Sequence, residues 1–127
     1  MPAGARLFLA LGALCALAAV MLGAFGAHAL KSRLSADMLA VYHTGVTYHF
    51  IHALGLLLVG LAFFHLPDGF ALRASGWLFA AGLVLFSGSL YALAVSGERW
   101  LGAVTPLGGT AFILGWAAFA WAVLRAP

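Results

Sequence analysis

Four long stretches without a charged residue constrain the fold of this chain most strongly. Each stretch is longer than the roughly 20 residues that a helix needs to cross about 30 Å of hydrocarbon. The six basic and three acidic residues lie in short clusters between and beside these stretches. The uncharged stretches are residues 7–30, 38–67, 74–97 and 100–124. This alternation predicts an all-α, polytopic membrane protein that folds as a bundle of four transmembrane helices.

The composition agrees with a membrane protein and excludes several other classes. Hydrophobic residues make up 65% of the 127 residues and charged residues 7%, whereas soluble domains have about 45–50% and about 25%. The net charge of +3 comes from scattered basic residues that form no stripe, so nucleic acid is not an expected partner. Basic residues at the ends of spans are typical anchors at headgroup level. We therefore expect membrane lipids as partners.

The ends of the four helices can be placed from capping and turn residues. Ser35 is a suitable N-cap for the second helix, with Asp37 in its first turn facing the positive end of the helix dipole. Thr105 is the expected N-cap of the fourth helix, with Pro106 in its first turn. The helices should span about residues 7–27, 36–65, 74–95 and 105–124, within one transmembrane domain over residues 1–127.

The second helix is unusually long for a membrane span. Thirty residues at 1.5 Å per residue would extend about 45 Å, which exceeds the hydrocarbon thickness. Its early part carries Tyr42, His43 and Thr44. We therefore expect the N-terminal part of this helix to lie in the interface or to tilt.

Small residues recur at steps of three and four along the first and fourth helices, with a shorter set on the third. Because lipid offers no hydrophobic force between helices, close approach of backbones over small residues holds such bundles together. We expect these residues to pack within the bundle, ahead of a separate dimerisation surface. The expected helix-packing residues are Gly12, Ala16, Gly23, Gly26, Gly88, Gly108, Ala111, Gly115 and Ala118.

Polar residues within the spans gather near the first and third loops. Successive helices of such a bundle alternate in direction, so the end of one and the start of the next share a membrane face. The predicted cluster therefore lies in one half of the bilayer, where its members must turn toward the bundle or water. It comprises His28, Thr44, Tyr48, His52, Ser87, Ser89, Tyr91 and Thr105.

This cluster has two interpretations. The favoured one is that its side chains hydrogen-bond between helices and fix their register. The other is a pocket for a lipid or small molecule, since ionisable residues within a membrane are often functional. His28, His49 and His52 could approach a metal, but no carboxylate or thiol of the spans joins them, and Cys15 is alone. We expect no metal, no cofactor and no enzymatic activity.

The motifs of the chain resemble those of the small inner-membrane protein family typified by bacterial YgdD, which has eukaryotic transmembrane relatives. The resemblance covers nearly the whole chain and implies four membrane helices without an assigned activity or catalytic residue. His49 lies outside the motifs, so a pocket argued from them does not depend on it. The motifs are, in order, residues 23–28 (GAFGAH), 44–45 (TG) with Tyr48 and His52, 86–91 (FSGSLY), 105–109 (TPLGG) and 115–116 (GW).

The sequence favours a non-enzymatic accessory subunit or a small module that binds a lipid or another small molecule. The alternative is a small transporter or channel that acts as an oligomer, and a homo-oligomer or a membrane-protein partner stays open. The family resemblance implies the bacterial inner membrane. The basic residues are divided equally between the two faces, and the free amine favours cytoplasmic termini.

Overall fold

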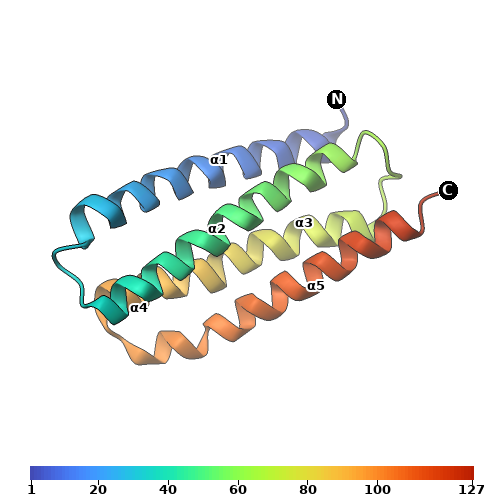
Figure 1. Ribbon diagram of the computed structural model, residues 1–127. Coiled ribbons are helices and arrows are strands. Elements are labelled where there is room, and N and C mark those ends of the chain that lie inside the picture. The colour runs from blue at the N-terminus through green and yellow to red at the C-terminus, as the bar shows by residue number, and fades with distance from the viewer.

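The chain folds into a bundle of four long antiparallel spans (Figure 1). The computed structural model describes all residues, Met1–Pro127. It contains no strands, so the predicted all-α transmembrane bundle is confirmed. The elements are α1 (Ala3–Phe25), the π-helical turn η1 (Gly26–Leu30), α2 (Ala36–Ala62), α3 (Phe70–Gly82), the π-helical segment η2 (Leu83–Ser87), α4 (Gly88–Ser96), the 3-10 turn η3 (Arg99–Ala103) and α5 (Thr105–Leu124).

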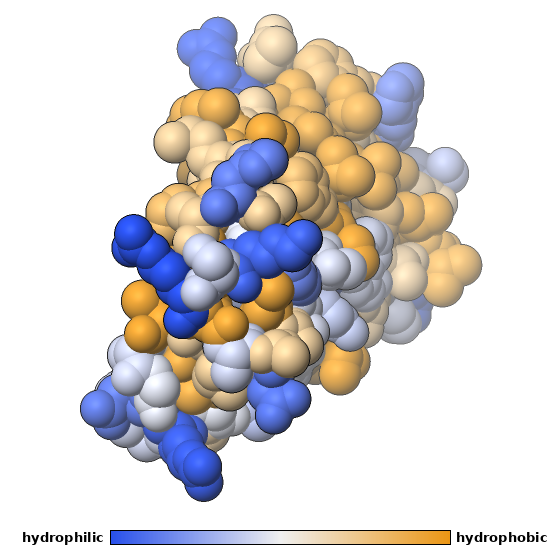
Figure 2. Space-filling model, turned by 60° about the vertical axis from the view of Figure 1, so that its left-hand side comes forward, coloured by the Kyte–Doolittle hydropathy of each residue, from blue (hydrophilic) through white to orange (hydrophobic).

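Both termini lie at one end of the bundle, together with the loop between α2 and α3, and the first and third loops lie at the other end (Figure 1). α2 and the α3–α4 span are the inner members, and α1 and α5 expose most of their length. Figure 2 shows hydrophilic residues gathered at the end that carries the first and third loops, with hydrophobic residues along the sides. An apolar belt between two polar ends is the surface of a protein that spans a membrane.

The third span is not one regular helix. α3 begins at Phe70, four residues before the expected start, and the span then passes through η2 before it continues as α4. It ends at Gly97, whose φ of 74° is left-handed, a conformation that glycine adopts without steric cost. The apolar pattern did not reveal η2, because a single widened turn leaves an entirely apolar stretch unchanged.

Several helix ends differ from the predicted ones. α1 begins at Ala3 and continues into η1, and α2 ends at Ala62, three residues early. Ser35 does cap α2, since its Oγ accepts a hydrogen bond from the backbone N–H of Met38 at 3.2 Å. Thr105 does not cap α5, because it is already helical and its hydroxyl lies 2.7 Å from the Oγ of Ser89 on α4.

Glycines on the outer helices allow two close backbone contacts. A Cβ at Gly12 would lie 2.9 Å from the backbone nitrogen of Leu57, so α1 meets α2 there. A Cβ at Gly108 would lie 2.3 Å from the backbone nitrogen of Phe86, so α5 meets η2 there. Contacts as short as these exclude any side chain, and the two outer helices are therefore held against the inner spans by backbone approach.

Other expected packing residues take different positions. Gly26 and Gly115 lie under the rings of Tyr42 and Phe79, and Ala111 is buried. Gly88 is not a packing residue, because a Cβ there would meet nothing nearer than a carbonyl oxygen at 3.9 Å. Gly23, Ala16 and Ala118 are also only half-buried, since their helix faces turn partly to the surface. Tightly covered glycines on α2 and α3 were missed, and these are Gly45, Gly55, Gly60, Gly76 and Gly82.

The buried core is divided along the bundle. The larger part, beside the termini, is apolar and includes Phe8, Leu56, Val59 and Phe79. A smaller group surrounds Tyr42 near the first and third loops. The buried polar side chains with hydrogen-bond partners therefore lie from that second end to the middle of the bundle, where the candidate site is found.

Candidate functional site

Hydrogen bonds join the spans in the half of the bundle beside the first and third loops. Ser87 on η2 donates from its Oγ to the backbone carbonyl of Gly45 on α2 at 2.8 Å. Ser89 on α4 and Thr105 on α5 share a hydrogen bond between their hydroxyls. Tyr42 donates from its hydroxyl to the backbone carbonyl of Leu22 on α1. Each bond satisfies a polar group that lipid could not, and each fixes the position of one helix along another.

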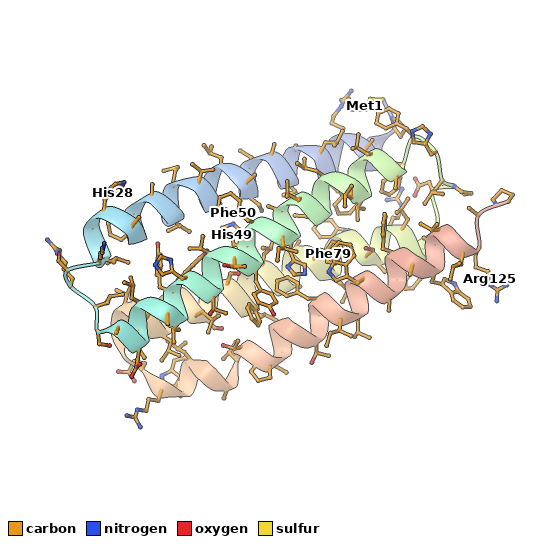
Figure 3. The ribbon with its side chains drawn as sticks, viewed as in Figure 1. Met1, His28, His49, Phe50, Phe79 and Arg125 are labelled. Atoms are coloured by element: carbon orange, nitrogen blue, oxygen red, sulfur yellow. The ribbon has the colours of Figure 1, made fainter.

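Two residues of the predicted cluster do not join it. His28 lies on η1 with its side chain exposed (Figure 3), because the π-helical turn carries it to the outer face of the bundle. Thr44 is exposed, and its hydroxyl donates back to the carbonyl of Ala40 in its own helix at 3.0 Å. Spacing by four residues places Thr44 near Tyr48 and His52, but the bundle covers only the later part of that helix face.

His52 occupies a closed aromatic box. Its ring is 3% exposed, lies parallel to Phe112 with 3.5 Å between the ring centres, and contacts Phe79 edge-on. Its Nε2 accepts a hydrogen bond from the Trp116 indole N–H at 3.0 Å. An Nε2 that accepts must be unprotonated, so Nδ1 carries the proton of the neutral ring and donates it to the carbonyl of Tyr48.

Both nitrogens of His52 are therefore used within the protein. No donor or acceptor of this ring is left for a ligand, and we assign His52 a packing role between α2 and α5. Tyr48 covers the edge of the same box, with its ring centre 4.5 Å from that of Phe86. The Tyr48 side chain is 41% exposed and its hydroxyl binds no group of the protein.

His49 and Tyr91 form the second polar pair that involves a histidine. The Nδ1 of His49 on α2 lies 2.8 Å from the hydroxyl of Tyr91 on α4. His49 is 8% exposed, and its ring also neighbours the backbone of Cys15 on α1. A tyrosine hydroxyl can donate once and accept twice. One bond to His49 therefore leaves the Tyr91 hydroxyl able to bind a further group.

This pair lies in a crevice of about 370 Å³ between α1 and the third span, with α2 as its floor. The volume is within the range of about 300–1,000 Å³ that small-molecule sites occupy. Apart from His49 and Tyr91 the lining is almost entirely apolar, and the crevice is open at the surface of the bundle. Its walls are formed by Leu11, Cys15, His49, Leu56, Ala80, Leu83, Val84, Gly88 and Tyr91.

The segment η2 borders this crevice. Leu83 and Val84 begin it and Gly88 follows it, and all three line the cavity. π-Helical turns within α-helices occur frequently at functional sites. Gly88 packs against no neighbouring helix. Because it has no side chain, it leaves space in the crevice beside Tyr91.

The arrangement limits the chemistry of the crevice. The structure contains no group of three or more His, Cys, Asp or Glu side chains that could hold a metal together. No charged side chain lines the cavity, so a charged group would enter it without a counter-charge. The crevice is therefore an apolar volume, with the hydrogen-bonded pair of His49 and Tyr91 among its lining residues at one place.

Sequence reasoning missed three residues of this region. His49 was set aside because it lies outside the family motifs, yet it is the histidine that lines the crevice. Tyr42 was treated as an interfacial residue, and it is 1% exposed. Trp116 was part of the GW motif, but no role was predicted for it. A signal existed for His49, because it lies four residues after Gly45 of the TG motif, and residues at that spacing share a helix face.

Comparison with known proteins places the chain in a family. Residues 22–109 match the family model described as "Protein of unknown function (DUF423)", which is more than half of the chain. The chain belongs to the DUF423 family. The predicted resemblance to a family of small membrane proteins is thereby confirmed. The matched residues include His49 and Tyr91. Leu11 and Cys15, on the α1 wall of the crevice, and Trp116 lie outside the match.

The relatives of this DUF423 member are bacterial proteins named as membrane proteins. The UPF0382 membrane protein YwdK of Bacillus subtilis is 52% identical over 111 residues, which cover 87% of this chain and 90% of the relative. The UPF0382 membrane protein SERP0230 of Staphylococcus epidermidis is 44% identical over 120 residues, which cover 94% and 97%. No solved structure matches the chain. With four apolar spans, these relatives identify a multi-pass bacterial membrane protein.

Proposed function

We propose that this protein is a non-enzymatic binding module of the bacterial inner membrane that holds a small lipid-like molecule in the crevice of His49 and Tyr91. The observation that carries the proposal is the position of this hydrogen-bonded pair, with His49 buried and Tyr91 half-buried, in an otherwise apolar cavity that opens at the surface of the bundle. Such a module would serve as an accessory subunit when it presents its ligand to a partner.

The lining defines the class of ligand. A molecule in this crevice touches Leu11, Leu83 and Val84 with its body, so that body is apolar. It meets a hydroxyl and an imidazole at one end, so it carries a hydrogen-bonding group such as a hydroxyl, a carbonyl or an ester. Because no ionised side chain faces the cavity, the bound part of the ligand is neutral.

Binding is favoured over transport by the other half of the bundle. A path across the membrane needs polar groups at every depth, and the half beside the termini is filled by Phe8, Leu56, Val59 and Phe79. A small transporter or channel built from several copies stays a prediction from the sequence. The crevice is the structural feature that distinguishes the two functions, and it supports a binding module.

The test is native mass spectrometry of the protein released from its own membrane lipids. We expect the wild-type protein to carry a reproducible bound mass. Ala80→Leu should remove it, because the larger side chain fills the crevice, and Tyr91→Phe should weaken it, because the ligand loses a hydroxyl. Ala117→Leu, which adds the same volume to an exposed face of α5, should leave it unchanged. Bare wild-type protein, or a mass that survives Ala80→Leu, would contradict the proposal.

We further propose that both termini are cytoplasmic, since the free amine joins Arg6 and Arg125 on that face. Cysteines introduced at Glu98 and at Ala126 in a Cys15→Ala background test this. In intact spheroplasts, a membrane-impermeant maleimide should label Glu98→Cys and leave Ala126→Cys unmodified until lysis. The reverse pattern would invert the orientation.

A further inference from the structure

A second cavity lies at the opposite end of the bundle from the polar cluster. It is a groove of about 600 Å³ between the start of α3 and the end of α5, beside the loop that joins α2 to α3. Neither the polar cluster nor the crevice includes any of its residues.

Small apolar side chains on two facing helices line much of the groove, beside the larger Phe70, Leu72 and Trp121. Ala71 and Ala74 of α3 and Ala118 and Ala122 of α5 line it, and each is half-buried. Alanines on both walls keep the helices from closing the space with their own side chains. A flexible hydrocarbon chain is the membrane component whose chemistry matches an apolar groove between two helices.

One charged side chain lies at the rim of the groove. Arg125 is the only charged residue that lines the groove, and it follows directly after the last residue of α5. Its guanidinium carbon lies 4.5 Å from the centre of the Trp121 ring, which also lines the groove. A tryptophan and an arginine at the end of a span are positioned at headgroup level.

Arg125 is also unpaired, unlike the neighbouring arginine. Arg73 at the start of α3 donates two hydrogen bonds to the carboxylate of Asp68, so these two charges neutralise each other. No carboxylate lies within ion-pair distance of Arg125. A guanidinium presents a fork of N–H donors that matches the oxygens of a phosphate.

We propose that this groove is a binding site for one anionic phospholipid, with an acyl chain between α3 and α5 and the phosphate on Arg125. The stacking of Arg125 on Trp121 holds the guanidinium in place at the rim. The site is independent of the crevice of His49 and Tyr91, and its occupant differs from the neutral ligand proposed there.

The test compares phosphatidylglycerol and phosphatidylcholine added to the purified, delipidated full-length protein, with bound lipid measured by native mass spectrometry. We expect the wild-type protein to retain phosphatidylglycerol and to bind phosphatidylcholine at least about fivefold more weakly, the factor that one basic residue contributes near an anionic surface. Arg125→Gln should lower phosphatidylglycerol retention by a similar factor. Arg125→Lys keeps the charge without the fork and should lie between the two.

Two further variants separate the groove from surface charge. Ala118→Leu keeps Arg125 and fills the groove, so it should lose phosphatidylglycerol. Arg99→Gln removes another exposed arginine, at the other end of the bundle, and should retain phosphatidylglycerol. Unchanged retention in Arg125→Gln or in Ala118→Leu, or an equal loss in Arg99→Gln, would overturn the proposal. In Arg125→Gln protein released from its own membrane lipids without delipidation, the mass expected in the crevice should persist, so the failure of one site is distinguishable from the failure of the other.

Discussion

The Nδ1 atom of His49 lies 2.8 Å from the hydroxyl oxygen of Tyr91, a residue 42 positions later in the chain. This contact joins α2 to α4 at the edge of a crevice that α1 closes on its other side. His52, three residues later on α2, uses both ring nitrogens within the protein. Two histidines on one helix thus have different roles, His52 in packing and His49 in the proposed site.

The His49–Tyr91 contact should contribute measurably to stability. Polar contacts between membrane helices contribute about 0.6 kcal/mol on average and up to about 2 kcal/mol. We predict a coupling energy in this range from a double-mutant cycle of His49→Phe and Tyr91→Phe, measured by reversible unfolding in mixed micelles. Tyr48→Phe is the matched control, because the Tyr48 hydroxyl binds no group of the protein, and its stability should stay near that of the wild type. Additive effects of the two single variants would show that the contact is not formed.

A substitution in the aromatic box of His52 should destabilise the protein more than one in the crevice. His52→Ala removes a ring stacked on Phe112 and leaves the Trp116 N–H without its acceptor on α2. We predict a loss of about 2 kcal/mol, at the upper end for polar contacts in membranes. His28→Ala, on the exposed turn η1, should leave the melting temperature unchanged. If the two histidine variants melt alike, the assignment of His52 to packing is wrong.

Two glycines of the family motifs should respond in opposite ways to alanine. At Gly108 a Cβ would lie 2.3 Å from the backbone of Phe86, which cannot move aside as a side chain can. We predict that Gly108→Ala separates α5 from η2 and lowers the yield of folded protein several-fold. Gly88→Ala meets no neighbour and should be neutral or stabilising by up to about 1 kcal/mol, since alanine favours the helix. Fluorescence-detected size exclusion distinguishes these outcomes, and equal profiles would refute the close approach.

Ser87 should stabilise the bundle through its hydrogen bond to α2. Its Oγ donates to the Gly45 carbonyl at 2.8 Å from a buried position on η2. Ser87→Ala should cost about 1 kcal/mol of unfolding free energy. Ser96→Ala is the control, because the exposed Ser96 hydroxyl donates to the carbonyl of Ala92 in its own helix and accepts from the backbone N–H of Glu98 in the following loop, and so joins no second span. A larger effect in Ser96→Ala would mean that Ser87 does not connect the two spans.

The spans could be predicted from the sequence because the bilayer imposes their length and composition. Uncharged stretches of sufficient length leave few alternatives to four helices, and the alternation of direction then places Ser87, Ser89, Tyr91 and Thr105 in one half of the bundle. Membership of a polar half follows from topology alone. The hydrogen-bond partner of each residue does not, because it depends on the rotation of each helix about its axis.

The rotation of the helices explains the errors at the site. Thr44, Tyr48 and His52 share one face of α2 by spacing, but the bundle buries His52 and leaves Thr44 exposed. His49 lies about 60° away on that helix by the same count, and the α3–α4 span covers it. The segment η2 adds a local change of rotation within the third span, which no periodic pattern in an apolar stretch can reveal.

The most direct test of ligand binding in the crevice is a crystal structure grown from a lipidic phase with protein that retains its co-purified lipids. We predict elongated electron density in the crevice along Leu83 and Val84, with its polar end within hydrogen-bond distance of the Tyr91 hydroxyl or the His49 ring. A crevice closed by the side chains of α1, or one without density beside an intact His49–Tyr91 contact, would contradict it.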